Sequence, residues 1–186
     1  MSKKISLIRF SSRDSGNCAA ISNQIKQHYR TECITSFTVD ANTAVPCSNC
    51  DYECLSQGKN CPNITDAYAG MMDNICQADL AYFIVPNYCG YPCANYFAFN
   101  EKSVGYFNMD RARMQKYMDI PKRFIVVSNS EGENFENAMR QQTNSDPEIL
   151  YMKTSKYGKR STTGDMMDTE AAKEDLEAFL NAYHIG

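Results

Sequence analysis

The sequence predicts an α/β protein in which helices cover both faces of a parallel sheet. Short apolar segments rich in β-branched and aromatic residues alternate with segments of helical periodicity. The most apolar of these, residues 80–85, shows no polar alternation, as expected for a strand buried on both faces. The chain has 186 residues, of which 43% are hydrophobic, and this suits one domain with a sizeable core.

Five short apolar segments are predicted to be strands. The first ends in a run of polar turn residues, and the third is predicted to stop at Pro86 and Asn87. In chain order the strands are residues 5–10, 33–39, 80–85, 124–127 and 148–152.

Helical periodicity follows each of these strands. The first helix has apolar residues at helical spacing over 20–29, with Ser15 or Asn17 as its cap. The later helices are predicted around residues 67–75, 95–107, from the loop at 128–132 to about 142, and 172–183. Residues 154–165 are predicted to be a loop. The chain is thus one domain over residues 1–186, with a cysteine-rich loop inserted at about 46–62.

The composition excludes several classes of protein. With 19 Lys and Arg against 22 Asp and Glu, the net charge of −3 favours neither nucleic acid nor an anionic membrane. The longest strongly apolar run is far shorter than the roughly 20 residues of a membrane-spanning helix, and Arg9 and Arg13 interrupt any signal-peptide core. We therefore expect a cytoplasmic protein with no nucleic-acid or membrane partner.

Ligands of open parallel sheets lie beyond the carboxyl ends of the strands, so the loops after Phe10, Val85 and Val127 form the candidate site. The first loop places hydroxyls and Arg13 before a helix N-terminus, whose free N–H groups and dipole attract anions. A phosphate monoester would satisfy these groups, although an ordinary polar turn has a similar composition. The candidate residues of this loop are Ser11, Ser12, Arg13, Ser15, Gly16, Asn17 and Cys18.

The other two loops complete this candidate site. Residues 86–92 contain two tyrosines and two prolines, which suit a planar heteroaromatic ligand or, alternatively, packing on the protein's own surface. Together, a phosphate site and a planar-ring site describe a mononucleotide such as FMN. Residues 158–162 lack the upstream glycine of a P-loop and are left out of the site. The candidate residues of the two loops are Pro86, Asn87, Tyr88, Cys89, Gly90, Tyr91, Ser128, Asn129, Ser130 and Gly132.

Four of the nine cysteines are crowded into one segment, as Cys47, Cys50, Cys54 and Cys61. An odd total argues against a complete disulfide framework, and such crowding in a reducing compartment is typical of metal or redox chemistry. Four thiolates can hold a 4Fe-4S cluster or a tetrahedral zinc ion; a reduced loop without metal is the third alternative. Three further cysteines are predicted to be small buried hydrophobes, namely Cys18, Cys33 and Cys76.

Over essentially its whole length the chain resembles the flavodoxin-like NADPH-dependent FMN reductases, particularly the branch that contains the iron–sulfur flavoproteins. That family has a G-S-x-R-x-x-S-N-type loop after the first strand. Ser11, Arg13 and Asn17 match this motif, whereas Phe10 and Gly16 stand where the family usually has glycine and serine. The family's alanine–aspartate pair and P-x-Y-x-G-type loop are matched by Ala78, Asp79, Pro86, Tyr88 and Gly90.

The resemblance implies a flavodoxin-like, five-stranded parallel sheet of order 2-1-3-4-5 with helices on both faces. It also implies non-covalently bound FMN, with the loop after Val85 against the isoalloxazine ring. The four crowded cysteines correspond to a 4Fe-4S site in that branch, although three residues separate the second and third cysteine here instead of the usual two. A dimer or tetramer is expected.

The function implied by the resemblance is electron transfer from NAD(P)H or a protein donor to a small acceptor, such as a flavin or a quinone. The flavin carries the chemistry, so no catalytic side chain is expected. Two alternatives remain open. One is an iron–sulfur or zinc electron carrier without FMN, and the other is a binding protein of the same shape without enzymatic activity.

Overall fold

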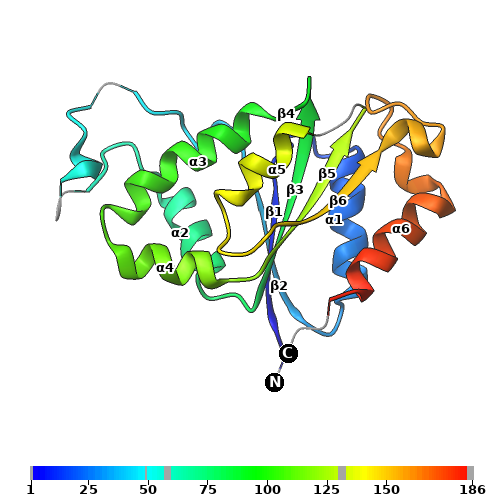
Figure 1. Ribbon diagram of the computed structural model, residues 1–186, viewed down its shortest axis with the longest axis horizontal. Helices are drawn as coiled ribbons and strands as arrows, with labels where there is room; N and C mark the ends of the chain where they lie inside the picture. The colour runs from blue at the N-terminus through cyan, green and yellow to red at the C-terminus, as the bar shows by residue number, and fades with distance from the viewer. Residues whose placement is uncertain (1, 49, 57–59, 130–132, 184–186) are drawn as a thin grey trace.

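The computed structural model describes the chain except for residues 1, 49, 57–59, 130–132 and 184–186. A parallel sheet forms the middle layer of a three-layer α/β sandwich (Figure 1). Its strand order, β2-β1-β3-β5-β6, corresponds to 2-1-3-4-5 among the five long strands, and it confirms the predicted flavodoxin-like topology. The long strands are β1 (Lys4–Arg9), β2 (Cys33–Thr38), β3 (Leu80–Tyr88), β5 (Lys122–Ser128) and β6 (Glu148–Lys153).

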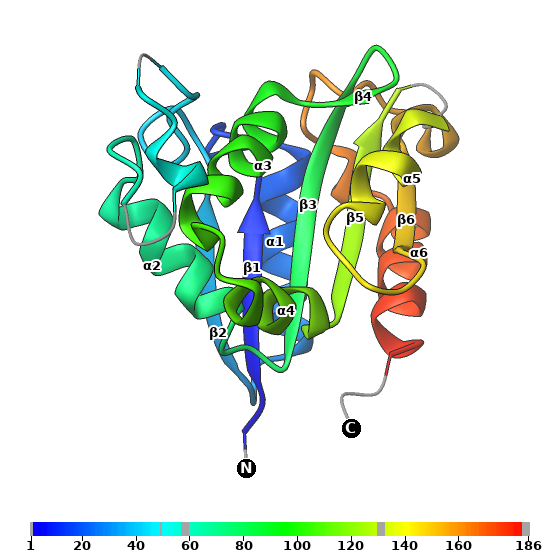
Figure 2. The ribbon, with the colours of Figure 1, turned by 60° about the vertical axis from the view of Figure 1, so that its left-hand side comes forward.

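Helices cover both faces of the sheet (Figures 1 and 2). One face carries α2 (Asp66–Ile75), α3 (Ala94–Phe107), α4 (Arg111–Asp119) and α5 (Glu133–Arg140); the other carries α1 (Asn17–His28) and α6 (Glu170–Asn181). Among the described residues, no helix is long and apolar enough to cross a membrane.

The two faces of the sheet have different cores. On the α3 side, Phe10 lies in an aromatic cluster, with its ring centroid 5.5 Å from that of Phe83 and 5.3 Å from that of Phe99. On the α1 side the core is mainly aliphatic, with residues such as Leu7, Ile21 and Leu176. Because the side chain of Phe10 is buried on the α3 side, it fills the core and does not occupy the loop that follows β1.

The third strand is longer than predicted. Pro86 and Asn87 do not end it, because the two-residue strand β4 (Tyr91–Pro92) turns back and pairs antiparallel with Asn87 and Tyr88. Pro86 cannot donate to the ladder, but its carbonyl accepts a hydrogen bond from the Cys93 N–H at 3.1 Å, just beyond β4. The strand therefore projects beyond the sheet as a hairpin.

Three further features differ from the sequence prediction. The helix α4 was not predicted, because charged residues are interspersed among its few apolar ones and only Tyr117 of the helix is buried. The N-cap of α1 is Gly16, so neither Ser15 nor Asn17 caps this helix. The predicted loop at 154–165 begins with a short 3-10 helix, η2 (Thr154–Tyr157). Two other short 3-10 helices are η1 (Glu53–Leu55) and η3 (Met166–Asp168).

Strand β5 begins two residues earlier than predicted, with two buried cationic side chains. Arg123 donates from Nε to Glu148 Oε2 at 2.8 Å and from Nη1 to the Phe179 carbonyl at 2.7 Å. Its guanidinium carbon also lies 3.7 Å from the centroid of the Phe179 ring. A charge buried in this way is satisfied by its partners and attaches α6 to the sheet.

Candidate functional site

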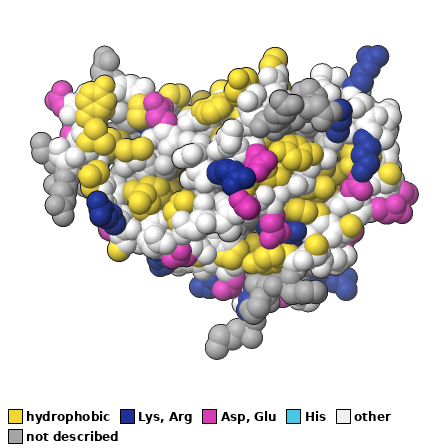
Figure 3. Space-filling view, viewed as in Figure 1, with side chains coloured by type: hydrophobic (Ala, Val, Ile, Leu, Met, Phe, Trp, Pro, Cys, Tyr) yellow, Lys and Arg dark blue, Asp and Glu magenta, His cyan; other side chains and the backbone are white. Residues whose placement is uncertain are grey.

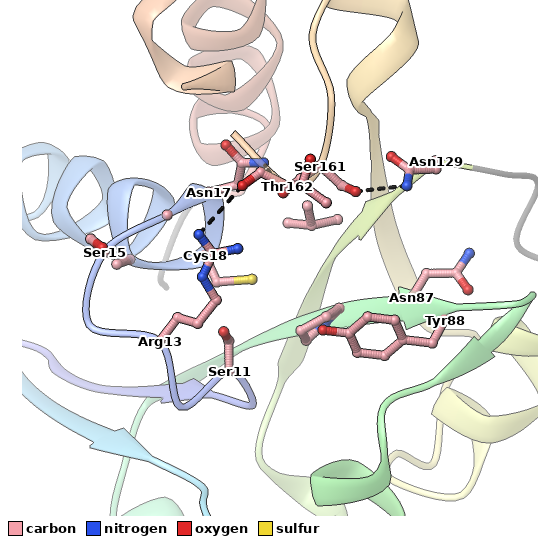
Figure 4. A pocket seen from close by; sticks show the side chains of 14 residues that line it. Ser11, Arg13, Ser15, Asn17, Cys18, Asn87, Tyr88, Asn129, Ser161 and Thr162 are labelled. Carbon is pink, nitrogen blue, oxygen red and sulfur yellow. Dashed lines mark hydrogen bonds between the residues drawn. The ribbon is translucent and has the colours of Figure 1, made fainter. Parts of the chain in front are cut away.

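A pocket of about 130 Å³ lies at the carboxyl edge of the sheet (Figure 4). It is bounded by the loop after β1, the start of α1, the ends of β3 and β5, and part of the segment that follows η2. The residues that line it are Ser11, Arg13, Ser15, Gly16, Asn17, Cys18, Ala19, Pro86, Asn87, Tyr88, Val127, Asn129, Ser161 and Thr162.

The N-terminus of α1 opens into this pocket. Gly16 adopts a φ of +129°, a conformation that favours glycine, and its carbonyl accepts the Ala20 N–H at 2.9 Å. Among the described residues, no side chain caps this helix. The N–H groups of residues 17–19 have no intrahelical acceptor, and these residues line the pocket, so the helix end is available to an anion.

Arg13 adds a positive charge at the same place. A Cβ on Gly16 would lie 3.5 Å from the guanidinium carbon of Arg13, so the arginine folds back over the helix terminus. Its Nη2 also donates to the Thr162 carbonyl at 3.5 Å, a long hydrogen bond that leaves other N–H groups of the guanidinium for a ligand. The helix dipole and this cation together favour a bound anion such as a phosphate group.

The opposite end of the pocket is aromatic. Tyr88 and Tyr91 are directly opposed on β3 and β4, and 64% and 53% of their surfaces are exposed. The two-residue turn between them consists of Cys89 and Gly90, with φ values of +54° and +85°, as in a type I′ hairpin. Tyr88 lines the pocket beside Pro86. The rings of these two residues offer a flat surface on which a planar ligand can stack.

Asn87 holds the hairpin in place. Its Nδ2 donates to Ser128 Oγ at 2.7 Å, and its Oδ1 accepts the Gly90 N–H at 2.9 Å. Ser128 is buried at the end of β5, so this contact ties the hairpin to the neighbouring strand. Ser128 therefore positions the site without lining it.

The structure brings together most of the predicted site residues of the described chain and leaves several outside the pocket. Those that do not line it are Ser12, Cys89, Gly90, Tyr91 and Ser128. Ser130 and Gly132 lie outside the described residues. The sequence analysis missed four lining residues, namely Ala19, Val127, Ser161 and Thr162. For the last two, the only local signal in the sequence was Gly164, where the backbone comes close to that of Gly16.

The thiols near the pocket are protonated and structural. Burial raises the pKa of Cys18 to about 12. Burial also raises the pKa of Cys93, whose Sγ donates to the Phe10 carbonyl at 3.3 Å. Cys76 is buried as predicted, but the same prediction for Cys33 is wrong, because this residue lies at the start of the edge strand β2 and is exposed.

The cysteine-rich segment lies far from this pocket, on α3 (Figure 1). Cys47 Sγ accepts a hydrogen bond at 3.4 Å from Nζ of Lys102, which is only 1% exposed. Cys61 packs against Gly105, where a Cβ would lie 2.9 Å from its Sγ. Within the described part of the chain, no three Cys, His, Asp or Glu side chains are placed to hold a metal ion. The metal site predicted on Cys47, Cys50, Cys54 and Cys61 is therefore not supported by these positions.

No protein-family model matches the sequence, and no curated protein matches it. Solved structures do match over nearly the whole chain. The Trp repressor binding protein of Bacillus subtilis superposes with a TM-score of 0.62 at 15% identity, over 97% of this chain and 99% of that one.

Two enzymes superpose over a similar extent. The flavoenzyme FerB of Paracoccus denitrificans, an NAD(P)H:(acceptor) oxidoreductase, gives a TM-score of 0.57 at 12% identity, over 96% of both chains. An azoreductase of Bacillus anthracis gives 0.54 at 13% identity, over 98% of this chain and 96% of that one. At these identities the likeness establishes the fold, and the site must be argued from its own residues.

Proposed function

We propose that this chain binds FMN in the pocket at the carboxyl edge of the sheet and acts as an NAD(P)H-dependent oxidoreductase. One observation carries the proposal: an uncapped helix terminus beside Arg13 and the exposed ring of Tyr88 lie at two ends of one site. A flavin mononucleotide has a phosphate at one end and a planar ring at the other, so its shape and charge match this arrangement. The names of the superposed flavoenzyme and azoreductase agree with this class of activity.

The residues of the pocket divide the work of binding between them. The N–H groups at the start of α1 and the guanidinium of Arg13 would hold the phosphate, with Ser11 and Ser15 as further hydroxyl donors. Pro86 and Tyr88 would lie along the flavin ring. Asn87 keeps these two residues in place through its hydrogen bonds to the hairpin and to β5. When bound, the flavin supplies the redox chemistry. The protein orients it and leaves one side accessible to donor and acceptor.

The finer parts of the proposal follow from the resemblance seen in the sequence. The donor is NADH, NADPH or a protein, and the acceptor is a small molecule such as a quinone or a flavin. We also propose a dimer or tetramer, which light scattering of the purified chain would detect. None of these proposals depends on a metal centre in the cysteine-rich segment.

The proposal is tested by titrating the flavin-free protein with FMN and following the visible absorption. Replacing Arg13 with alanine removes a charge-assisted hydrogen bond and should weaken FMN binding about 10- to 100-fold. The matched control is Arg30→Ala, since Arg30 is an exposed arginine just beyond the opposite end of α1. Equal FMN affinity in the Arg13→Ala variant and the unchanged protein would show that the phosphate does not bind here.

Activity gives a second test. The FMN-loaded protein should oxidise NADH or NADPH when a quinone is supplied, and the loss of the absorption band of the reduced nicotinamide reports the rate directly. A protein that binds FMN without this turnover would be a flavin-binding carrier.

A further inference from the structure

The segment of residues 159–165, here called the closing segment, lies against the first loop although it follows the last strand of the sheet (Figure 4). The backbones of the two regions touch at Gly164 and Gly16. A Cβ on Gly164 would lie only 2.9 Å from the Gly16 Cα, and both glycines have positive φ. No larger residue fits at Gly164 without moving one of the two backbones.

Two amide side chains, the buried Asn17 and the exposed Asn129, fix the closing segment from both sides. Asn17, which is 5% exposed, donates from Nδ2 to the Ser161 carbonyl at 3.4 Å and accepts the Met166 N–H on Oδ1 at 3.0 Å. From the side of β5, Asn129 donates to Ser161 Oγ at 2.6 Å and accepts from Thr154 Oγ1 at 2.7 Å. The segment therefore bridges the loop after β1 and the loop after β5.

An ion pair closes the base of the segment. Lys159 Nζ lies 2.8 Å from Asp165 Oδ2, so the residues at its two ends are joined. Towards the pocket, the carbonyl oxygens of Ser161 and Thr162 accept hydrogen bonds from Asn17 and Arg13. The wall beside the helix terminus thus consists of closely packed backbone that these hydrogen bonds hold in place.

We infer that the closing segment makes the phosphate end of the pocket a closed cradle, which accepts the terminal phosphomonoester of FMN and excludes the diphosphate-linked nucleotide FAD. This inference rests on the proposed function. A terminal phosphate can direct its free oxygens at the N–H groups of α1 and at Arg13. A diphosphate would have to extend its second phosphoryl group and its nucleoside past Gly16, where the backbone of Gly164 is already in contact and leaves no room for them.

The test compares the affinities of FMN, FAD and riboflavin for the flavin-free full-length chain by isothermal titration calorimetry. We expect the dissociation constant of FAD to exceed that of FMN at least about a hundredfold. The Gly164→Ala variant adds a Cβ that pushes the segment away from Gly16, and it should lower this ratio to about tenfold or less. Ser161→Ala removes the Asn129 contact without backbone strain and should lower the ratio a few-fold.

The matched control is Gly158→Ala, just before the closing segment. Gly158 also has a positive φ, of +65°, but a Cβ there would meet nothing within 4 Å. This variant carries the backbone strain of Gly164→Ala without the clash, so its ratio should stay that of the unchanged protein. Because both affinities are measured on one preparation, their ratio is insensitive to partial unfolding.

The outcomes separate this inference from the proposed function. FAD binding as tightly as FMN to the unchanged chain would overturn the inference alone, as would equal changes of the ratio in Gly164→Ala and Gly158→Ala. Failure of the unchanged chain to bind either flavin would overturn the proposed function and this inference with it. Tight FMN, weak FAD and a selective effect of Gly164→Ala support both.

Discussion

The loop after β1 and the cysteine-rich segment both have the composition of a binding site, but they are supported in different ways. The first loop leaves the sheet at Phe10, whose backbone N–H donates to the Ile84 carbonyl and whose ring is in the core. The cysteine-rich segment rests on the outside of α3 and exposes large apolar side chains (Figure 3). Those side chains are Tyr52 and Leu55.

The donors of the two regions differ in kind. In the first loop the principal donors are backbone N–H groups at the start of a helix, which the fold holds in place before any ligand arrives. In the cysteine-rich segment they are thiols on a chain whose regular structure, among the described residues, is the short η1. Two buried polar atoms near it, Glu53 Oε2 and Asn63 Nδ2, have no hydrogen-bond partner within the described residues. A strand-end site is therefore preorganised, whereas a site built from side chains on an outlying segment is not.

The largest expected effect is on stability, and it tests whether the first loop rests on the core while the cysteine-rich segment does not. Phe10→Ala removes a buried ring beneath the first loop and should lower the free energy of unfolding by about 3–5 kcal/mol. Leu55→Ala, at a residue that is 57% exposed, should change it by less than about 0.5 kcal/mol. Urea denaturation measures both. A loss of several kcal/mol in Leu55→Ala would mean that the cysteine-rich segment is part of the cooperative core.

The next largest effect is a difference in the rate of thiol alkylation between the two regions. With a pKa of about 12, Cys18 has roughly one thiolate in ten thousand molecules at pH 8, and it is also buried. Cys47 is exposed and should react with iodoacetamide at least about a hundredfold faster, as followed by mass spectrometry of peptides.

The alkylation rate at Cys18 should also increase with pH. Because deprotonation is the limiting event, the rate at Cys18 should rise about tenfold per pH unit between pH 7 and 9. Urea-unfolded protein is the control, since all its thiols should react alike. Equal rates at Cys18 and Cys47 in the folded chain would contradict the buried, protonated thiol.

A smaller effect is expected from backbone strain, which is present in the hairpin beside the pocket and in the cysteine-rich segment. Cys89 in the hairpin and Tyr52 before η1 each adopt a φ of +54°, which is unfavourable for residues other than Gly, Asn and Asp. Cys89→Asn and Tyr52→Asn should each raise the free energy of unfolding by about 0.5 kcal/mol, measured by thermal denaturation. A decrease in stability in either variant would show that the side chain makes packing contacts worth more than the strain.

The smallest expected effect concerns whether the cysteine-rich segment influences FMN binding at the pocket. Cys50→Ser and Cys54→Ser should leave the FMN dissociation constant within about twofold, because distant and independent sites act additively. The iron and zinc content of the same anaerobically purified proteins should be compared in parallel. Weaker FMN binding in these variants, or a stoichiometric metal that they lose, would show that the segment is a functional part of the site.

Local patterns were sufficient for much of the fold and for half of the site. The apolar run at 80–85 predicted the central strand, and the alternation of strands and helices predicted the sheet. The polar loop before α1 pointed to Arg13 because its charge and its position at a helix terminus are both visible in sequence. By contrast, α4 was missed because its apolar face is short and flanked by charged residues, and the hairpin was missed because a proline such as Pro86 usually ends a strand.

The sequence by itself determined the alternation of strands and helices, the edge at which ligands bind and the loop that carries the positive charge. These follow from periodicity and from residue chemistry within a few positions. Only the tertiary structure decided that Ser161 and Thr162 form the second wall of the pocket, since Asn17 and Ser161 are 144 positions apart. Contacts between loops so distant in sequence depend on how β1 and β6 are placed in the sheet, and this leaves no periodic signal in the chain.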